Sequence, residues 1–242
     1  MNDVALVTAN FGEIDDLKPL PRHDGVDAFY YTDAGGFVNA APTAVATWTR
    51  VLVPNYPRYD FGSRMRSRYF KHQIHRLDEV QRHRWLVWAD SAFQFHDMSF
   101  VLGEVERLRR LPPRKRFLFI PHPDRRTILQ EYEFIDGAIK DGSEYFRVRY
   151  GHEKMTEQME HFRQSGWNLE AHLVCGGLWI VEHSDLMQRC WDAWWDQVLR
   201  YGMMDQLSLP VMLEEFGCEA QTFDVSVWKN PHFTHVGHCR EM

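Results

Sequence analysis

The chain has 242 residues with 28 Lys and Arg, 34 Asp and Glu and a formal net charge of -6, which argues against a protein that wraps nucleic acid. Its 44% hydrophobic and 14% aromatic residues exclude an intrinsically disordered chain, because they can bury enough apolar surface to offset the entropy of ordering. The charge is unevenly placed: residues 64–126 hold 15 Lys and Arg against 7 Asp and Glu, which predicts one positive site for a small anionic ligand.

Short apolar segments alternate with segments of helical spacing along the chain. Strands are predicted at 4–9, 28–32, 48–53, 85–89, 117–120, 173–181 and 222–225. Helices are predicted at 61–77, 97–111, 125–139, 155–164, 184–199 and 205–216. Such alternation is typical of an α/β fold. The apolar stripe of 184–199, which includes Trp191, Trp194 and Leu199, is interpreted as core.

Several classes of protein find no support in the sequence. No apolar run reaches the roughly 18 residues of a membrane span, and the first residues carry no basic leader. The cysteines at 175, 190, 218 and 239 form no CxxC pair, so neither a zinc knuckle nor a redox motif is indicated. We therefore expect a cytoplasmic protein with reduced thiols. The basic stretch 109–116 is interpreted as an exposed loop, which leaves contact with an acidic acceptor or a membrane surface open.

Polar side chains follow four of the predicted strands. They are Thr8 and Asn10, Thr32 and Asp33, Asp90 and Ser91, and His122 with Arg125 and Arg126. In open α/β sheets, ligands bind outside the carboxyl ends of the strands. The joint pattern therefore predicts a site at that edge, although each residue alone is weak evidence.

Asp90 directly follows the apolar strand 85–89, and its carboxylate could bind a hard divalent cation there. The alternative is an Asx turn or a helix cap. His232, His235 and His238 recur every three residues, and one or two of them could complete a metal site with Asp90. The alternative is a surface tail in which the histidine spacing is fortuitous.

Three basic residues of the helix 61–77 share one of its faces. Arg64, Arg68 and Lys71 stand at i, i+4 and i+7, a spacing that would let them neutralise a diphosphate together. The alternative is a solvated helix face.

Further carboxylates occur at predicted helix starts. Asp205 is predicted to be a helix N-cap, and its side chain could also project into a cleft. Glu131 and Glu133 could be acid/base groups or ordinary surface charges. The sequence contains no GxSxG, P-loop or GxGxxG motif, so common hydrolase, NTPase and dinucleotide fingerprints give no support.

The order of these features resembles the GT-A nucleotide-sugar glycosyltransferases. More narrowly, the chain is similar to a glycosyltransferase-like domain of plant mucilage-related and bacterial polysaccharide proteins. The matching segments are 8–12, 31–33, 64–71, 88–91, 122–126, 176–181 and 194–208. The resemblance implies one Rossmann-related domain over 1–242, with a mixed, mostly parallel sheet flanked by helices. It further implies a donor-binding half at 1–125 and an acceptor-side half at 126–242.

The resemblance also implies roles for individual residues. Donor binding would fall to Thr8, Asn10, Thr32, Asp33, Arg64, Arg68, Lys71, Asp90, Gly176 and Gly177. Asp205 and Gln206 would be catalytic, and His122 and Arg125 would lie on the acceptor side. Asp90 would match the last carboxylate of the family's Asp-x-Asp motif and bind Mn²⁺ or Mg²⁺, with His235, or His238, completing the metal site.

One position departs from the family pattern. Trp88 stands where the first carboxylate of the Asp-x-Asp motif would be. Metal-independent transfer, in which Arg and Lys replace the charge of the cation, therefore stays open.

Together these expectations point to a hexosyltransferase-type enzyme in polysaccharide biosynthesis. It would move a sugar from a nucleoside diphosphate donor, with UDP favoured, to a hydroxyl of a glycan or glycoconjugate. Asp205 would accept the acceptor's proton or position the acceptor. The alternatives are a metal-dependent nucleotide-sugar or phosphodiester hydrolase, a non-catalytic module that binds acidic glycans, and a degenerate transferase.

Overall fold

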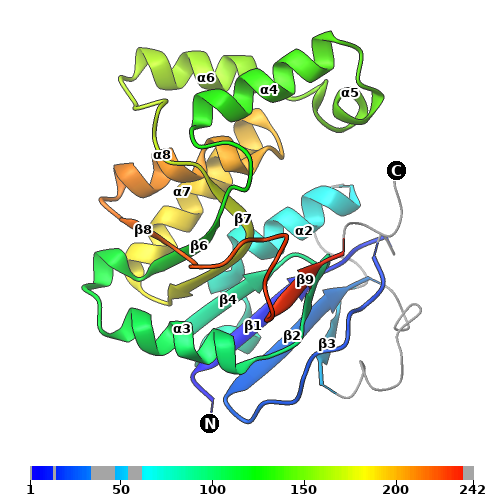
Figure 1. Cartoon of the computed structure of the whole chain (residues 1–242), viewed down its shortest axis with the longest axis vertical. Helices are drawn as coiled ribbons and strands as arrows, with labels where there is room; N and C mark the ends of the chain where they lie inside the picture. The colour runs from blue at the N-terminus through cyan, green and yellow to red at the C-terminus, as the bar shows by residue number, and fades with distance from the viewer. Residues whose placement is uncertain (1, 13–14, 34–46, 54–61, 237–242) are drawn as a thin grey trace.

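The computed structural model describes residues 2–12, 15–33, 47–53 and 62–236. Seven strands form its main sheet, in the order β3-β2-β1-β4-β7-β6-β8 (Figure 1). They are β1 (Val4–Ala9), β2 (Val26–Thr32), β3 (Thr49–Leu52), β4 (Trp85–Ala89), β6 (Phe117–Pro121), β7 (Val174–Glu182) and β8 (Ala220–Thr222). Only β7 runs antiparallel to its neighbours, so the sheet is mixed and mostly parallel, as predicted.

Helices cover this sheet and extend beyond one of its edges (Figure 1). They are α2 (Ser63–His72), α3 (Ser99–Arg109), α4 (Ile128–Lys140), α5 (Glu144–Tyr150), α6 (Met155–Gln164), α7 (Asp185–Tyr201) and α8 (Leu209–Glu215). Short 3-10 turns stand at Ile74–Arg76, Asp78–Val80, Pro113–Lys115 and Asp205–Leu207. A second sheet pairs β5 (Phe93–Phe95) with β9 (Phe233–His235) in antiparallel fashion. The sequence predicted neither α5 nor this small sheet.

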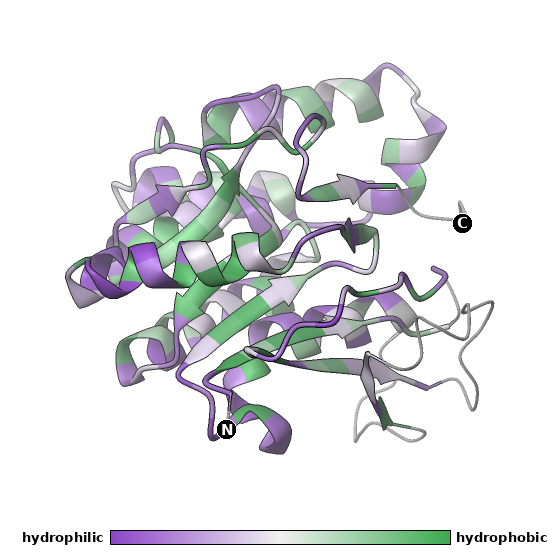
Figure 2. Cartoon of the chain, turned by 60° about the horizontal axis from the view of Figure 1, so that its bottom comes forward, coloured by the Kyte–Doolittle hydropathy of each residue, from purple (hydrophilic) through white to green (hydrophobic). Residues whose placement is uncertain are grey.

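Two hydrophobic cores lie on opposite faces of the main sheet. Ala5 and Val7 of β1 face the core shared with α2, α7 and α8, whereas Val4 and Leu6 face the core shared with α3. This alternation follows from the two-residue period of a strand. The cores appear in Figure 2 as green central strands between helices of mixed colour.

The prediction of a buried stripe on α7 is largely confirmed. Trp191 and Trp194 are fully buried, but Leu199 is 49% exposed, so its assignment to the core is wrong. Ser184 caps this helix by accepting a hydrogen bond from the backbone N–H of Met187.

The predicted helix 205–216 is interrupted. Residues Asp205–Leu207 form a 3-10 turn, and α8 begins only at Leu209. Pro210 lies in the first turn of α8, where a residue without an N–H costs no helical hydrogen bond. The break places Asp205 in a buried turn instead of on a regular helix.

The basic stretch 109–116 is engaged by the protein itself. Arg109 pairs with Asp3, Lys115 with Glu219 and Arg116 with Glu182. Arg114 donates to the backbone oxygens of Phe216 and Gly217, which end α8. The charged side chains of this stretch therefore connect segments that are distant in the sequence. Within the described ranges, no helix is long and apolar enough to cross a membrane.

Candidate functional site

A cavity of about 540 Å³ lies at the carboxyl edge of the parallel strands. Asn10 follows β1, Asp90 follows β4 and His122 follows β6, and all three line it. Strands that run in the same direction end at the same edge, so these side chains converge although they are distant in sequence. The cavity size is typical of small-molecule sites.

The basic face of α2 points into this cavity, as its spacing predicted. Arg64, Arg68 and Lys71 all line the cavity, so the alternative of a solvated helix face is wrong for these three residues. Lys71 is almost fully buried, at 1% exposure.

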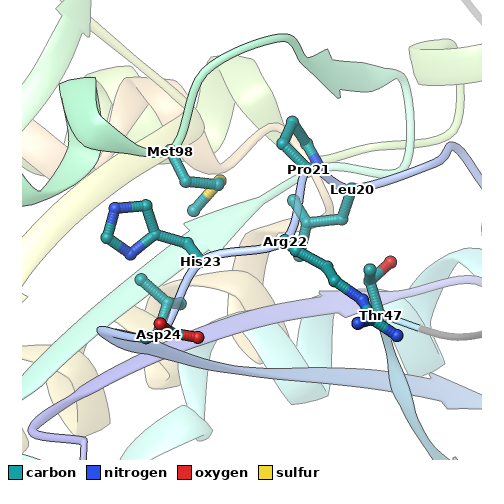
Figure 3. Close-up of a pocket in the computed structure, with 8 residues that line it drawn as sticks. Leu20, Pro21, Arg22, His23, Asp24, Thr47 and Met98 are labelled. Carbon is teal, nitrogen blue, oxygen red and sulfur yellow. The ribbon is translucent and has the colours of Figure 1, made fainter.

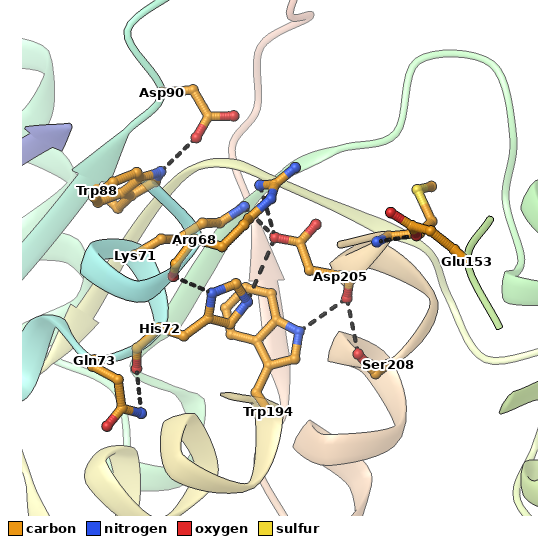
Figure 4. Close-up of polar contacts among 11 residues, drawn as sticks. Arg68, Lys71, His72, Gln73, Trp88, Asp90, Glu153, Trp194, Asp205 and Ser208 are labelled. Carbon is orange, nitrogen blue, oxygen red and sulfur yellow. Dashed lines mark hydrogen bonds and ion pairs between the residues drawn. The ribbon is translucent and has the colours of Figure 1, made fainter. Parts of the chain in front are cut away.

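The carboxylate of Asp205 holds two of these cations (Figure 4). Its Oδ2 lies 2.6 Å from Nζ of Lys71 and 2.9 Å from a guanidinium nitrogen of Arg68. Nε2 of the fully buried His72 lies 3.5 Å from the same oxygen. The backbone oxygen of Asp205 accepts hydrogen bonds from Trp194, at 2.9 Å, and from Ser208. The turn that carries Asp205 is thereby fixed to both α2 and α7.

This environment makes Asp205 a poor proton acceptor. Burial raises the pKa of its carboxyl, but the charges of Arg68 and Lys71 outweigh burial and hold the pKa well below its usual range. Burial lowers the pKa of His72 to about 3, so that ring is neutral near pH 7. A role of Asp205 as the base that accepts the acceptor's proton does not fit this geometry. The carboxylate instead organises two cations.

Both glycines of the strand β7 stand where a side chain would not fit easily. A Cβ on Gly176 would lie 2.8 Å from Nζ of Lys71, and one on Gly177 would lie 3.2 Å from Oδ2 of Asp90. Gly177 lines the cavity, and its backbone oxygen accepts a hydrogen bond of 2.7 Å from the backbone N–H of Asp90. The glycines therefore let β7 approach the charged groups of the site closely.

Trp88 forms a hydrogen bond with one carboxylate oxygen of Asp90, the predicted metal ligand. Its indole Nε1 donates a hydrogen bond of 2.7 Å to Oδ1 of Asp90 (Figure 4). His235 lines the same cavity, with its ring 5.0 Å from that of Phe93, whereas His238 lies outside the described residues. His232 does not line the cavity formed by the described residues; its ring stacks on Phe100.

The described side chains around Asp90 offer too few ligands for Mn²⁺ or Mg²⁺. Among the described residues, no group of three His, Cys, Asp or Glu side chains is placed to hold a metal ion. Asp90 and His235 alone are fewer ligands than a protein cage for a hard cation uses. These residues by themselves therefore do not form a complete metal site.

Two further arginines of the cavity differ from Arg68, Lys71 and Arg125 in their partners. Arg64 of α2 and Arg149 of α5 both line it, and within the described ranges neither pairs with a carboxylate. Arg149 instead donates a 2.8 Å hydrogen bond to the hydroxyl of Tyr145. Burial lowers the pKa of Arg64, and the like charge of Arg149 lowers it further. Two arginines that repel one another in a cavity are suited to share an anion.

The residues after β1 form a tight polar network. Asn10 accepts a hydrogen bond from the backbone N–H of Asp15 at 3.3 Å and donates to Tyr30 at the same distance. Ser91 donates to the carboxylate of Asp15. Asn10, Asp15 and Ser91 line the cavity and offer it polar atoms at this end.

Four predicted donor-binding residues lie elsewhere. Thr8, Thr32, Asp33 and Gly176 do not line the cavity that the described residues form. Thr8 and Thr32 are buried within their strands. The carboxylate of Asp33 accepts from the backbone N–H of Gly12 and from Arg66, so it ties a loop to α2.

A second charged cluster lies on the α4 side of the cavity. His122, Arg125, Glu131 and Gln206 all line it. Arg125 pairs with the buried carboxylate of Glu131, and Gln206 donates to the other oxygen of Glu131 at 3.3 Å. Burial raises the pKa of Glu131 although Arg125 opposes this effect, and burial together with Arg125 lowers the pKa of His122 to about 4. By contrast, Glu133 is exposed.

The cavity residues that the sequence did not identify include Asp15, Tyr145, Arg149 and Trp228. They lie on α5 and on loops, whose position relative to the sheet has no signal in local residue patterns. A charged or aromatic residue just before or within a short helix is not distinctive, so no spacing rule would have selected them.

A smaller pocket of about 280 Å³ lies away from these groups (Figure 3). Residues that precede β2 and β3, among them Arg22, Asp24 and Thr47, line it together with Met98. None of the residues that the sequence singled out for binding or catalysis lines this pocket.

No protein-family model matches the chain, and no similar sequence is found among curated proteins. Among solved structures, the apo form of mouse xyloside xylosyltransferase 1 is similar to it, with a TM-score of 0.47 and 9% sequence identity. The match covers 93% of this chain and 86% of that one. The function proposed below rests on the side chains that line the cavity.

Replacing Asp205 by Asn should lower the free energy of unfolding by about 3–5 kcal/mol, because Lys71 would keep a buried charge without a counter-ion. Urea denaturation measures this loss. The pKa of Asp205 lies below its unfolded value of about 3.9, so its stabilisation is complete above that pH and is lost as the pH falls. The difference between wild type and variant should therefore shrink below about pH 4.

The matched control is Glu219→Gln, which removes the partner of Lys115 at the surface. That carboxylate is 59% exposed, and its loss should leave the free energy of unfolding nearly unchanged. Equal losses in the two variants would contradict the view that the Asp205 cluster is a buried anchor.

Replacing Gly176 by Ala should destabilise the protein by about 1–3 kcal/mol, since the new methyl group must displace Lys71 from its ion pair. Gly103→Ala on α3 is the control, because nothing lies within 4 Å of its added Cβ and alanine favours a helix by up to about 1 kcal/mol. Thermal and urea unfolding of both variants check the opposite signs.

Proposed function

We propose that this chain is a glycosyltransferase that moves a sugar from a nucleoside diphosphate donor to a hydroxyl of a glycan or glycoconjugate. UDP is the favoured nucleotide and a hexose the favoured sugar. The observation that carries the proposal is the cavity at the carboxyl edge of the sheet, where Arg64 and Arg149 have no carboxylate partner among the described residues.

The diphosphate would lie between α2 and α5. There the two guanidinium groups of Arg64 and Arg149 can each donate paired hydrogen bonds to phosphate oxygens. Arg68 stands one turn further along α2, and the carboxylates of Asp205 and Asp90 raise its pKa although burial lowers it. A charge that is fixed before the ligand arrives costs no reorganisation when the ligand binds.

The nucleoside would occupy the end of the cavity beside β1 and β4. Asn10, Asp15 and Ser91 present amide, carboxylate and hydroxyl groups there, which suits the hydroxyls of a ribose and the edge of a base. Thr8, Thr32 and Asp33 lie outside the described cavity, so this assignment rests on the residues that follow β1 and β4.

The transfer itself breaks the bond between the anomeric carbon and the diphosphate oxygen. The electron pair of that bond stays on the diphosphate, whose added negative charge Arg64, Arg149 and Arg68 stabilise. The acceptor oxygen forms the new bond to the anomeric carbon and gives its proton to an oxygen of the departing diphosphate. A bound Mn²⁺ or Mg²⁺, if the enzyme uses one, would supply further charge beside Asp90.

Two other functions share this cavity and are separated by their products. A nucleotide-sugar hydrolase would release free sugar with every acceptor offered, whereas a transferase yields a glycosylated acceptor. A non-catalytic module would bind acidic glycans in a salt-sensitive manner and would not need Asp90. A thermal-shift panel of nucleotide sugars, with Mn²⁺ and with a chelator, tests donor class and metal dependence together.

Alanine variants of Arg64 and Arg149 test the diphosphate site. Each should weaken UDP binding about 10- to 100-fold, because charge-assisted hydrogen bonds contribute about 1.5–3 kcal/mol. Binding of uridine, which lacks the phosphates, should change little. Calorimetric titration measures both ligands. Arg163→Ala, which removes an exposed partner of Glu160 on α6, is the control and should bind UDP as wild type does. Equal weakening of UDP and uridine would contradict the diphosphate assignment.

Asp90→Ala should abolish donor turnover. The carboxylate at the end of β4 accepts a hydrogen bond from Trp88, and its charge raises the pKa of Arg68 against the effect of burial, so its removal disturbs a cation assigned to the leaving group. A coupled assay of nucleoside diphosphate release gives the rate. Circular dichroism should show an unchanged fold, and wild-type turnover in the variant would sink this role for Asp90.

A further inference from the structure

Two aromatic rings of the cavity are open to solvent. Tyr145 and Trp228 are 54% and 60% exposed, and both line the cavity. Of the other rings that line it, Trp88 and Phe93 are buried, and Phe146 and Tyr150 are partly buried. An exposed tryptophan beside a polar cavity forgoes apolar burial, which a ligand can restore.

The loop that carries Trp228 is held by its own polar groups. The backbone N–H of Trp228 donates to Ser226 at 3.2 Å, and the side chain of Asn230 donates to the backbone oxygen of Ser226 at 2.9 Å. The same Asn230 accepts from the backbone of His232 and Phe233, where β9 begins. The indole meets His235 at 83°, with centroids 5.5 Å apart. A perpendicular contact covers at most one face of a ring, so a face of Trp228 stays open.

Polar and aromatic contacts also hold Tyr145, which lies on α5. Its hydroxyl accepts a 2.8 Å hydrogen bond from Arg149, and its ring meets Phe146 at 90°. The guanidinium of Arg149 also lies 5.6 Å from the ring centroid. The ring therefore stands beside one of the two arginines assigned to the diphosphate.

We propose that Tyr145 and Trp228 form the acceptor subsite and that the acceptor is a saccharide whose pyranose ring lies against them. This inference rests on the proposed function. One face of a pyranose carries mainly C–H groups and is apolar, while its hydroxyls lie around the rim. A flat, rigid ring matches that face at little cost in side-chain entropy. Arg125 and Gln206 line the same cavity and can hydrogen-bond the rim hydroxyls.

The position of Tyr145 favours the acceptor over the donor's base. The polar network suited to a nucleoside lies after β1 and β4, in Asn10, Asp15 and Ser91. Tyr145 lies on α5 beside Arg149, which would hold the diphosphate. Trp228 contacts His235, whose ring meets that of Phe93 after β4, so the comparison with UDP decides between acceptor and base for this ring.

The test uses the full chain and saturation-transfer NMR with methyl glycosides of glucose, galactose, xylose and mannose. At least one glycoside should receive saturation at the C–H protons of its apolar face. Trp228→Ala should weaken its binding about tenfold or more, and Trp228→Phe should retain part of it. Tyr145→Phe keeps the ring and should bind as wild type does. Leu199→Ala, which alters a 49% exposed residue outside the cavity, is the control.

Calorimetry with UDP on the same proteins separates this inference from the function on which it rests. Trp228→Ala should bind UDP within twofold of wild type. Failure of wild type to bind any nucleoside diphosphate would overturn the donor assignment while the glycoside result still stands. Glycosides that do not bind, or that bind Trp228→Ala as tightly as wild type, would overturn the saccharide subsite. A loss of UDP binding equal to the loss of glycoside binding would assign the ring to the donor instead.

Discussion

The buried ion cluster around Asp205 is the constraint on which the cavity depends. Its carboxylate draws Lys71 and Arg68 of α2 toward the turn before α8, and these partners stand 134 and 137 residues away in the chain. A buried lysine is costly without a counter-ion. The cluster therefore fixes α2 against the edge of the sheet, and β7 can pass it only because Gly176 has no side chain. With Lys71 and Arg68 engaged, Arg64 and Arg149 supply the charge that an anion would meet.

The uneven charge of the sequence resolves into two separate uses. In the stretch 109–116, Arg109, Lys115 and Arg116 pair with carboxylates and Arg114 caps the end of α8, and these contacts hold distant segments together. The basic face of α2 lies in the cavity. Basic residues thus hold segments together in the stretch 109–116 and line a candidate site on α2. Net charge alone could not distinguish them, since it counts charges without their partners.

Local patterns predicted much of the fold and the edge at which the site lies. The strand 85–89 and the spacing of Arg64, Arg68 and Lys71 each depend on a single periodicity, and both predictions are confirmed in geometry. Contacts between residues far apart in the sequence could not be predicted. The pairing of Asp205 with Lys71 turns an expected cap into a buried counter-ion, and α5 brings Arg149 and Tyr145 to the cavity from a segment without a marked pattern. Such placements follow from packing of the whole chain, which no window of sequence contains.

Trp88 illustrates how one position sets the electrostatics of a site. An acid there would add negative charge beside Asp90 and call for a cation. The indole instead donates a hydrogen bond to Asp90 and adds no negative charge. The remaining carboxylate lies near Arg68, whose pKa it helps to raise against the effect of burial. Fixed guanidinium groups need no ion-binding equilibrium, so their charge is present whenever the chain is folded. On the proposed function, the affinity for a diphosphate would then follow the geometry of α2 and α5.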